Sequence, residues 1–117
     1  MPNSHAPKRS VFFISDGTGI TAETLGQSLL TQFEGLPTKA TRMPFIDSVE
    51  KAHQCVLRIN AAHIDDGLKP IVFNTLVNSE TSQVIHAANA LVLDLFQTFI
   101  KPLEKELGLK STHTIGR

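Results

Sequence analysis

The chain has 117 residues, 41% of them hydrophobic, and its 11 basic and 11 acidic side chains give no net charge at pH 7. This length and composition fit one globular domain, and the even charge excludes the basic stripe by which proteins bind nucleic acid. A single cysteine excludes internal disulfides and thiolate metal sites, and no hydrophobic run reaches the ~18 residues of a membrane span, so we expect a cytoplasmic protein without a metal or a membrane partner.

Residues 1–8 are polar, contain two prolines and are expected to form a flexible tail before one α/β domain over residues 9–117. The hydrophobic residues 11–14 predict a first strand over residues 9–14. Residues 21–33 predict a helix, because hydrophobic side chains recur there at the spacing of one helical turn. The members of this hydrophobic stripe are Leu25, Leu29 and Phe33.

A second strand is predicted over residues 39–46, and a second helix follows it and runs to about residue 64. Asp47 is the expected N-cap of this helix, because Glu50 lies three residues farther on and completes a capping box. Hydrophobic residues at 70–75 then predict a third strand.

The last part of the chain repeats the alternation in shorter elements. A helix is predicted over residues 80–87, with Ser79 as its N-cap, and a fourth strand over residues 90–93. Asp94 is the expected N-cap of the last helix. Pro102 lacks an N–H group and crowds the preceding turn, so it should kink or restart that helix.

Four strands that alternate with four helices predict a three-layer α/β/α fold, Rossmann- or flavodoxin-like, with a mainly parallel four-stranded sheet. The expected strand order, numbered along the chain, is 2-1-3-4. In such sheets ligands bind beyond the carboxyl ends of the strands. The residues expected at this crevice are Ser15, Asp47, Thr75, Asn78, Ser79 and Asp94.

The most informative segment lies between the first strand and the first helix, where two glycines let the backbone turn sharply. The free N–H groups at the start of the helix point back at this turn and form a site for an anion such as phosphate. The residues expected to bind the anion are Gly17, Thr18, Gly19, Thr21, Ala22 and Glu23. Capping of the helix by Asp16 or Thr21 is the structural alternative, because caps and anion sites use the same N–H groups.

The same segment fits the pattern G-x-G-x-x-A of dinucleotide-binding proteins, with Asp47 after the second strand as a ribose-binding acid. Two observations weigh against this interpretation. Asp16 would repel a pyrophosphate, and Asp47 lies farther from the glycine turn than the ~20 residues usual for a ribose-binding acid. The simplest interpretation is a tight turn in which the glycines serve geometry alone.

The sequence contains no G-x-x-x-x-G-K-[ST] motif, and so no Walker-type nucleotide site. Residues 12–25, FFISDGTGITAETL, instead resemble the N-terminal signature of the bacterial phosphoenolpyruvate synthase regulatory proteins, which are related to the plant pyruvate, phosphate dikinase regulatory proteins. Residues 75–78 (TLVN), 94–96 (DLF) and 102–104 (PLE) also resemble the pattern of this family. The resemblance spans residues 9–117.

The resemblance implies a bifunctional serine/threonine kinase and phosphorylase, with ADP and inorganic phosphate as substrates and no cofactor held by this chain. Members of the family use ADP to phosphorylate a threonine of phosphoenolpyruvate synthase, the expected partner. They also remove that phosphoryl group with inorganic phosphate and release pyrophosphate. The family's nucleotide-binding P-loop lies in a C-terminal domain, so we expect this chain to be the N-terminal domain, without kinase activity by itself. A homodimer is compatible with the resemblance.

Under this hypothesis the turn at residues 16–23 holds a phosphate or phosphoryl group, and Asp16 orients the threonine hydroxyl as a base. Two alternatives remain open. The first is a non-catalytic docking or oligomerisation domain of the same enzyme. The second is a dinucleotide-binding oxidoreductase module.

Overall fold

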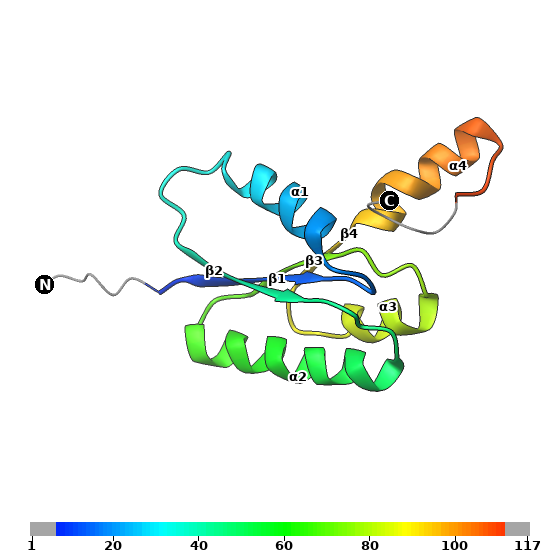
Figure 1. The fold of residues 1–117 in the computed structure, drawn as a ribbon. Coiled ribbons are helices and arrows are strands. Elements are labelled where there is room, and N and C mark those ends of the chain that lie inside the picture. Colours follow the sequence, from blue (N-terminus) through cyan, green and yellow to red (C-terminus); the bar gives the residue numbers. More distant parts are fainter. Residues whose placement is uncertain (1–6, 112–117) are drawn as a thin grey trace, which may run out of the picture.

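The computed structural model describes residues 7–111, which form one parallel β-sheet with helices on both faces (Figure 1). In chain order the elements are β1 (Arg9–Ile14), α1 (Ile20–Leu30), β2 (Thr38–Met43), α2 (Val49–Asp66), β3 (Ile71–Asn74), α3 (Ser79–His86), β4 (Leu91–Asp94), the π-helix η1 (Phe96–Ile100) and α4 (Lys101–Leu107). Most of the predicted tail lies outside the described residues, as do residues 112–117. No helix within the described range is both long enough and hydrophobic enough to cross a membrane.

The sheet confirms the predicted fold class and strand order. Its strands run parallel in the order β2-β1-β3-β4, and Phe13 of β1 lies beside Arg42 of β2 and Phe73 of β3. All carboxyl ends therefore meet at one edge of the sheet. Because β1 lies between β2 and β3, the direction of winding reverses at β1, and such a switch point is where α/β sheets bind ligands.

Two hydrophobic cores lie on opposite faces of the sheet (Figure 1). Successive residues of a strand point to opposite faces, so Phe12 and Ile14 pack toward α2 and α3, whereas Val11 and Phe13 pack toward α1. Other buried residues on the α2 and α3 side are Met43, Ile46, Ala52, Cys55, Ile59, Val72, Leu76, Ile85 and Ala88. Those on the α1 side are Ala22, Phe73 and Leu95.

The predicted hydrophobic stripe of the first helix is correct only at Leu25, which packs against the core, and wrong at its other two positions. The helix ends at Leu30, and both Leu29 and Phe33 are exposed. Its buried residues are Ala22 and Gly26, which lie on the side that faces the sheet. Small residues face inward because the aromatic rings of β1 and β3 already fill the space beneath the helix.

The predicted cap of the second helix is wrong by one residue. Ser48, not Asp47, is the N-cap of α2, and its hydroxyl oxygen accepts the N–H of Lys51 at 3.1 Å. Asp47 instead pairs with the Lys51 ammonium group at 2.9 Å. The capping box with Glu50 does not form, because the helix begins one residue later than the sequence pattern indicates.

The predicted cap of the third helix is also wrong by one residue, in the opposite direction along the chain. Asn78, not Ser79, is the N-cap of α3, and its side-chain oxygen accepts the N–H groups of Glu80 at 2.9 Å and Thr81 at 3.1 Å. An asparagine side chain reaches two N–H groups here, so the following serine becomes the first residue of the helix.

The last predicted helix is divided into η1 and α4. Asp94 ends β4, and its carboxylate accepts the N–H of Gln97 at 3.0 Å, which is the capping contact expected from the sequence. Pro102 lies in the first turn of α4, so the regular helix restarts there, as predicted. Gly108, with φ +66°, ends it.

Candidate functional site

The turn between β1 and α1 has the geometry of an anion site. The Ser15 hydroxyl oxygen accepts the N–H of Gly17 at 2.9 Å and holds the start of the turn. Gly19 is the N-cap of α1, and no side chain caps this helix. Capping by Asp16 or Thr21, the structural alternative, is therefore wrong. The N–H of Ile20 makes only a long contact of 3.4 Å with the Thr18 hydroxyl oxygen, and the N–H groups of Thr21 and Ala22 are left to bind a ligand.

The two glycines of the turn have different roles. Gly19 takes a φ of +86°, and a Cβ atom there would lie 2.8 Å from Cγ of Arg42. Gly17 has no such conformation, and a Cβ atom there would lie 3.8 Å from the Ser15 hydroxyl oxygen, an ordinary contact. Only Gly19 is therefore required by the backbone.

An ion pair lies beside this turn. Nη2 of Arg42 approaches Oε1 of Glu23 to 2.8 Å, so a cation from β2 offsets the carboxylate in the first turn of α1. The Ala22 side chain is buried in the core, so this residue can serve an anion through its N–H alone. Sequence reasoning missed Arg42. The available signal was its position near the carboxyl end of a strand that neighbours β1.

The segment after β2 is fixed to the turn by backbone hydrogen bonds. The N–H of Ser15 donates to the carbonyl of Met43 at 3.1 Å, and the N–H groups of Phe45 and Ile46 donate to the carbonyls of Gly17 at 2.8 Å and Ser15 at 2.9 Å. Phe45 adopts a φ of +59°, which is strained for a phenylalanine. These hydrogen bonds hold Phe45 in its strained conformation and connect the segment after β2 to the turn between β1 and α1.

Asp16 and Thr18 are exposed on the turn, and the structure gives the Asp16 carboxylate no hydrogen bond or ion pair with the described residues. Asp47 is also exposed, but its pKa is lowered because the Lys51 ammonium group donates a hydrogen bond to it and attracts its charge. Thr75 is buried, and its hydroxyl donates to the carbonyl of Ile14 at 3.1 Å. Of these four side chains, only Asp16 is both exposed and without a partner among the described residues, because the Thr18 hydroxyl oxygen accepts the N–H of Ile20 at 3.4 Å.

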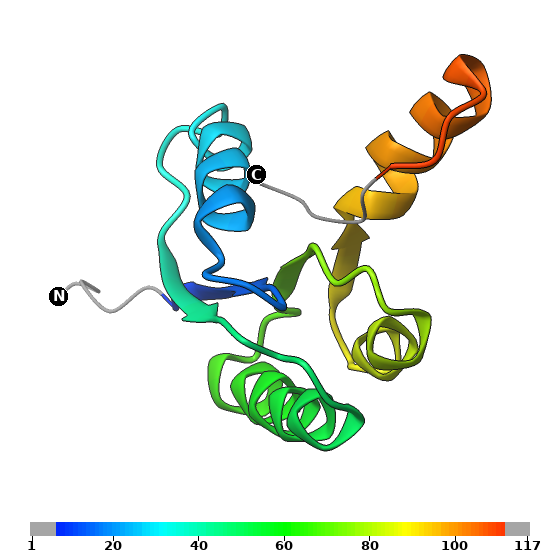
Figure 2. The same cartoon turned by 45° about the vertical axis from the view of Figure 1, so that its right-hand side comes forward.

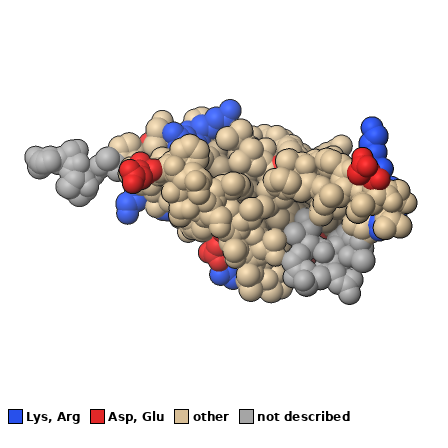
Figure 3. Space-filling model, turned by 90° about the horizontal axis from the view of Figure 1, so that it is seen from above, with Lys and Arg blue, Asp and Glu red and all other residues tan. Residues whose placement is uncertain are grey.

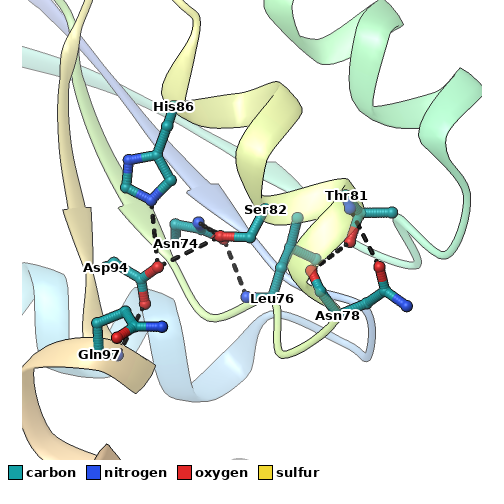
Figure 4. A network of polar contacts seen from close by, with 8 residues as sticks. All are labelled: Asn74, Leu76, Asn78, Thr81, Ser82, His86, Asp94 and Gln97. Carbon is teal, nitrogen blue, oxygen red and sulfur yellow. Dashed lines mark hydrogen bonds and ion pairs between the residues drawn. The ribbon is translucent and has the colours of Figure 1, made fainter.

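A network of polar side chains lies where β3 and β4 end (Figure 4). The side-chain amide of Asn74 donates to the Ser82 hydroxyl oxygen at 3.0 Å, and Ser82 donates to Asp94 at 3.3 Å. Nε2 of His86 lies 3.2 Å from the same carboxylate oxygen, Oδ2 of Asp94. The other Asp94 oxygen accepts the N–H of Gln97. The network fixes α3 against β3, β4 and the start of η1.

The predicted crevice is therefore divided into two parts. Asp94 and Ser79 line a surface pocket of about 290 Å³, together with His86 and Lys101, whereas Ser15 belongs to the glycine turn. Sequence reasoning missed Ser82 and His86. Their spacing of four residues, which places both side chains on one face of a helix, was the available signal. Within residues 7–111 no group of three or more His, Cys, Asp or Glu side chains could hold a metal ion.

The chain is similar to proteins of one family. A family model described as kinase/pyrophosphorylase matches residues 11–117. Relatives provisionally named phosphoenolpyruvate synthase regulatory protein occur in Cupriavidus metallidurans (60% identical), Ralstonia nicotianae (58%) and Azoarcus sp. strain BH72 (59%). These alignments cover 93%, 93% and 97% of this chain but 40%, 39% and 41% of the relatives, so the chain spans about two-fifths of their length. The resemblance seen in residues 12–25 is confirmed, and the chain belongs to the kinase/pyrophosphorylase family.

Proposed function

We propose that this chain is the N-terminal part of a bifunctional serine/threonine kinase and phosphorylase that regulates phosphoenolpyruvate synthase. The family model and the names of the relatives support this function. In one direction, a threonine oxygen of the synthase bonds to the terminal phosphorus of ADP, and AMP leaves. In the other, inorganic phosphate takes the phosphoryl group from the phosphothreonine, and pyrophosphate leaves. We assign the ADP site to the part of the relatives that lies beyond the matched segment.

The single observation that carries the role of this domain is the uncapped start of α1 at the switch point of the sheet. Phosphoryl transfer depends mainly on groups that position the phosphate and stabilise its charge. The N–H groups of Thr21 and Ala22 are suited to hold phosphate or the phosphoryl group of the target. Gly19 is needed for this geometry, because its φ of +86° and its close approach to the Arg42 side chain disfavour any larger residue.

Asp16 is the proposed general base. Its carboxylate is exposed, has no partner among the described residues and lies directly before the glycine turn. It would accept the proton of the threonine hydroxyl as the new O–P bond forms, and return that proton to the threonine oxygen in the reverse reaction. We also propose that the exposed Thr18 hydroxyl, whose oxygen accepts the N–H of Ile20 at 3.4 Å, donates a hydrogen bond to the same phosphoryl group.

Amide NMR on the 117-residue chain tests the anion site directly. We expect saturable shifts confined to residues 15–23 when inorganic phosphate or pyrophosphate is added, and smaller ones with ADP. A Gly19→Val variant should lose these shifts, whereas Gly17→Ala, which meets only an ordinary contact, should keep them. If millimolar phosphate and pyrophosphate shift no amide of the turn, the proposed role of the turn is wrong.

A separate experiment tests Asp16. It needs a hybrid protein, in which this chain replaces the matching segment of the Cupriavidus metallidurans relative. We expect Asp16→Asn to slow threonine phosphorylation and dephosphorylation by about 10²–10⁴-fold, as for the loss of a general base. Asp65→Asn, a matched change at an exposed carboxylate on α2, should leave both rates unchanged. Normal rates of the Asp16→Asn hybrid in both directions would contradict the base role.

The docking alternative also has a specific observation in its favour. Large hydrophobic side chains are exposed on β4, η1 and α4, where a catalytic role gives them no purpose. Docking by this surface is compatible with anion binding at the turn, because different residues serve the two roles. The family assignment favours phosphoryl transfer over the dinucleotide-binding alternative.

A further inference from the structure

The α1 side of β4 is an uncovered part of the sheet. Within the described residues β4 is an edge strand that pairs with β3, so that Leu91 lies beside Ile71 and Leu93 beside Phe73. The side chains of Leu91 and Leu93 therefore point to the same face as Phe73, the face that α1 covers over β1 and β3. They remain 47% and 37% exposed, because the helix does not extend over β4.

Within residues 7–111 neither helix after β4 covers this side of the strand. After β4, η1 and α4 lead away from the sheet, as Figure 2 shows, and α4 contains no buried residue. Phe99, Leu103 and Leu107 recur every four residues and form a hydrophobic stripe that is 49%, 53% and 62% exposed. A helix this short gains its stability from packing, so a stripe without a partner indicates a missing one.

The two leucines of β4 lie on the α1 side of the sheet. Figure 3 looks onto this side, where uncharged residues form the middle of the visible surface and Lys, Arg, Asp and Glu lie at its margins. A surface centre poor in charged residues is typical of an interface. Together the exposed hydrophobic side chains of β4, η1 and α4 form what we call the outer surface: Leu91, Leu93, Phe99, Leu103 and Leu107.

We infer that the outer surface is an interdomain docking site, covered in the family's longer proteins by the part of the chain that follows the segment matched here. The relatives are about two and a half times as long as the aligned segment, which is 40% of the Cupriavidus metallidurans protein. In those proteins the following residues are covalently attached to the segment that contains α4, and this attachment gives them a high effective concentration at the outer surface. A second copy of the chain, in contrast, would cover the outer surface only at high protein concentration and would leave it exposed on dilution. The inference rests on exposure and chain length and does not depend on the phosphoryl chemistry.

Thiol reactivity tests whether the outer surface is covered, by comparing the 117-residue chain with the hybrid of this chain and the Cupriavidus metallidurans relative. Leu93→Cys and Leu103→Cys place a thiol on the outer surface, and Leu57→Cys places a matched control on the exposed side of α2. The native Cys55 is buried and reports whether the domain is folded, since it should react slowly in every variant. Labelling is followed site by site by peptide mass spectrometry.

We expect the thiols at 93 and 103 to react at least about tenfold more slowly in the hybrid than in the 117-residue chain, and the thiol at 57 to react equally in both. Equal rates at all three positions would overturn the inference. Protection in the 117-residue chain that grows with its concentration would overturn it in favour of a second copy. If rapid labelling of Cys55 shows a misfolded junction, the same substitutions at the aligned positions of the intact relative decide the question.

Discussion

The rings of Phe13 and Phe73 stack on the α1 side of the sheet, with centroids 5.7 Å apart and planes inclined by 18°. Gly26 of α1 lies directly above them, since a Cβ atom there would come within 2.5 Å of the Phe13 ring and 2.8 Å of the Phe73 ring. The missing side chain at this position sets how closely α1 approaches the sheet. It therefore also sets the position of the helix start that forms the glycine turn.

We expect Gly26→Ala to destabilise the fold by about 1–3 kcal/mol, although alanine is the better helix former, because two buried rings cannot move aside in a packed core. Gly17→Ala is the matched control, because its Cβ atom meets only an ordinary contact. Urea unfolding of the two variants measures the difference. A Gly26→Ala variant as stable as the parent chain would show that the rings give way.

The same position shows why the hydrophobic pattern of α1 misled sequence reasoning. Leu25, Leu29 and Phe33 have the spacing of a buried stripe, but only Leu25 packs against the core, next to the buried Ala22 and Gly26. The small residues at 22 and 26 fit a pair of rings that come from β1 and β3, two strands far apart in the sequence. Such complementarity arises from tertiary packing and leaves no periodic signal in the helix itself.

The cap of α3 provides the next test. We expect Asn78→Ala to cost about 1 kcal/mol, because two N–H groups of α3 lose their acceptor, whereas Ser79→Ala should change stability little. Both positions are exposed, so differences in core packing do not confuse the comparison. Thermal unfolding of the pair measures this. A larger loss for Ser79→Ala would restore the cap that the sequence predicted.

The elements themselves were predictable, because four strand–helix alternations admit few topologies, and the strand order 2-1-3-4 is confirmed. The existence of the glycine turn was also predictable, since two glycines between a strand and a helix mark it locally, whereas the bonds that hold it to the segment after β2 were not. Arg42 could not be found in this way. Its contact with Glu23 depends on the register between β1 and β2, which only the assembled sheet defines.

Asp66 should make folding sensitive to acid. Its side chain is only 6% exposed, and its pKa is lowered from the ordinary 3.8 by hydrogen bonds from Lys39 and from the Ser10 hydroxyl. A carboxyl with a lowered pKa stabilises the folded state above its ordinary pKa, and this stabilisation is lost as the pH falls through the lowered value.

We therefore expect Asp66→Asn to lower stability at neutral pH and to flatten the loss of stability below pH 3.8, because the change removes this titration. Asp47→Asn is the control. The pKa of Asp47 is also lowered, by Lys51, but its side chain is exposed and solvent screens the pair. Urea unfolding across a pH series measures both. Parallel curves for Asp66→Asn and the parent chain would contradict this account.

The Arg42–Glu23 pair offers the sharpest test of the anion site. Arg42→Gln should weaken phosphate binding at the turn several-fold, because it removes a cation and leaves the Glu23 carboxylate uncompensated next to the helix start. Glu23→Gln in the same chain should recover much of the loss, since it removes the repulsion. Lys51→Gln, which breaks the pair with Asp47 instead, is the matched control and should have a smaller effect. The dissociation constants come from the amide NMR titration. If Arg42→Gln and Lys51→Gln weaken binding equally, phosphate responds to overall charge, and the turn is not its specific site.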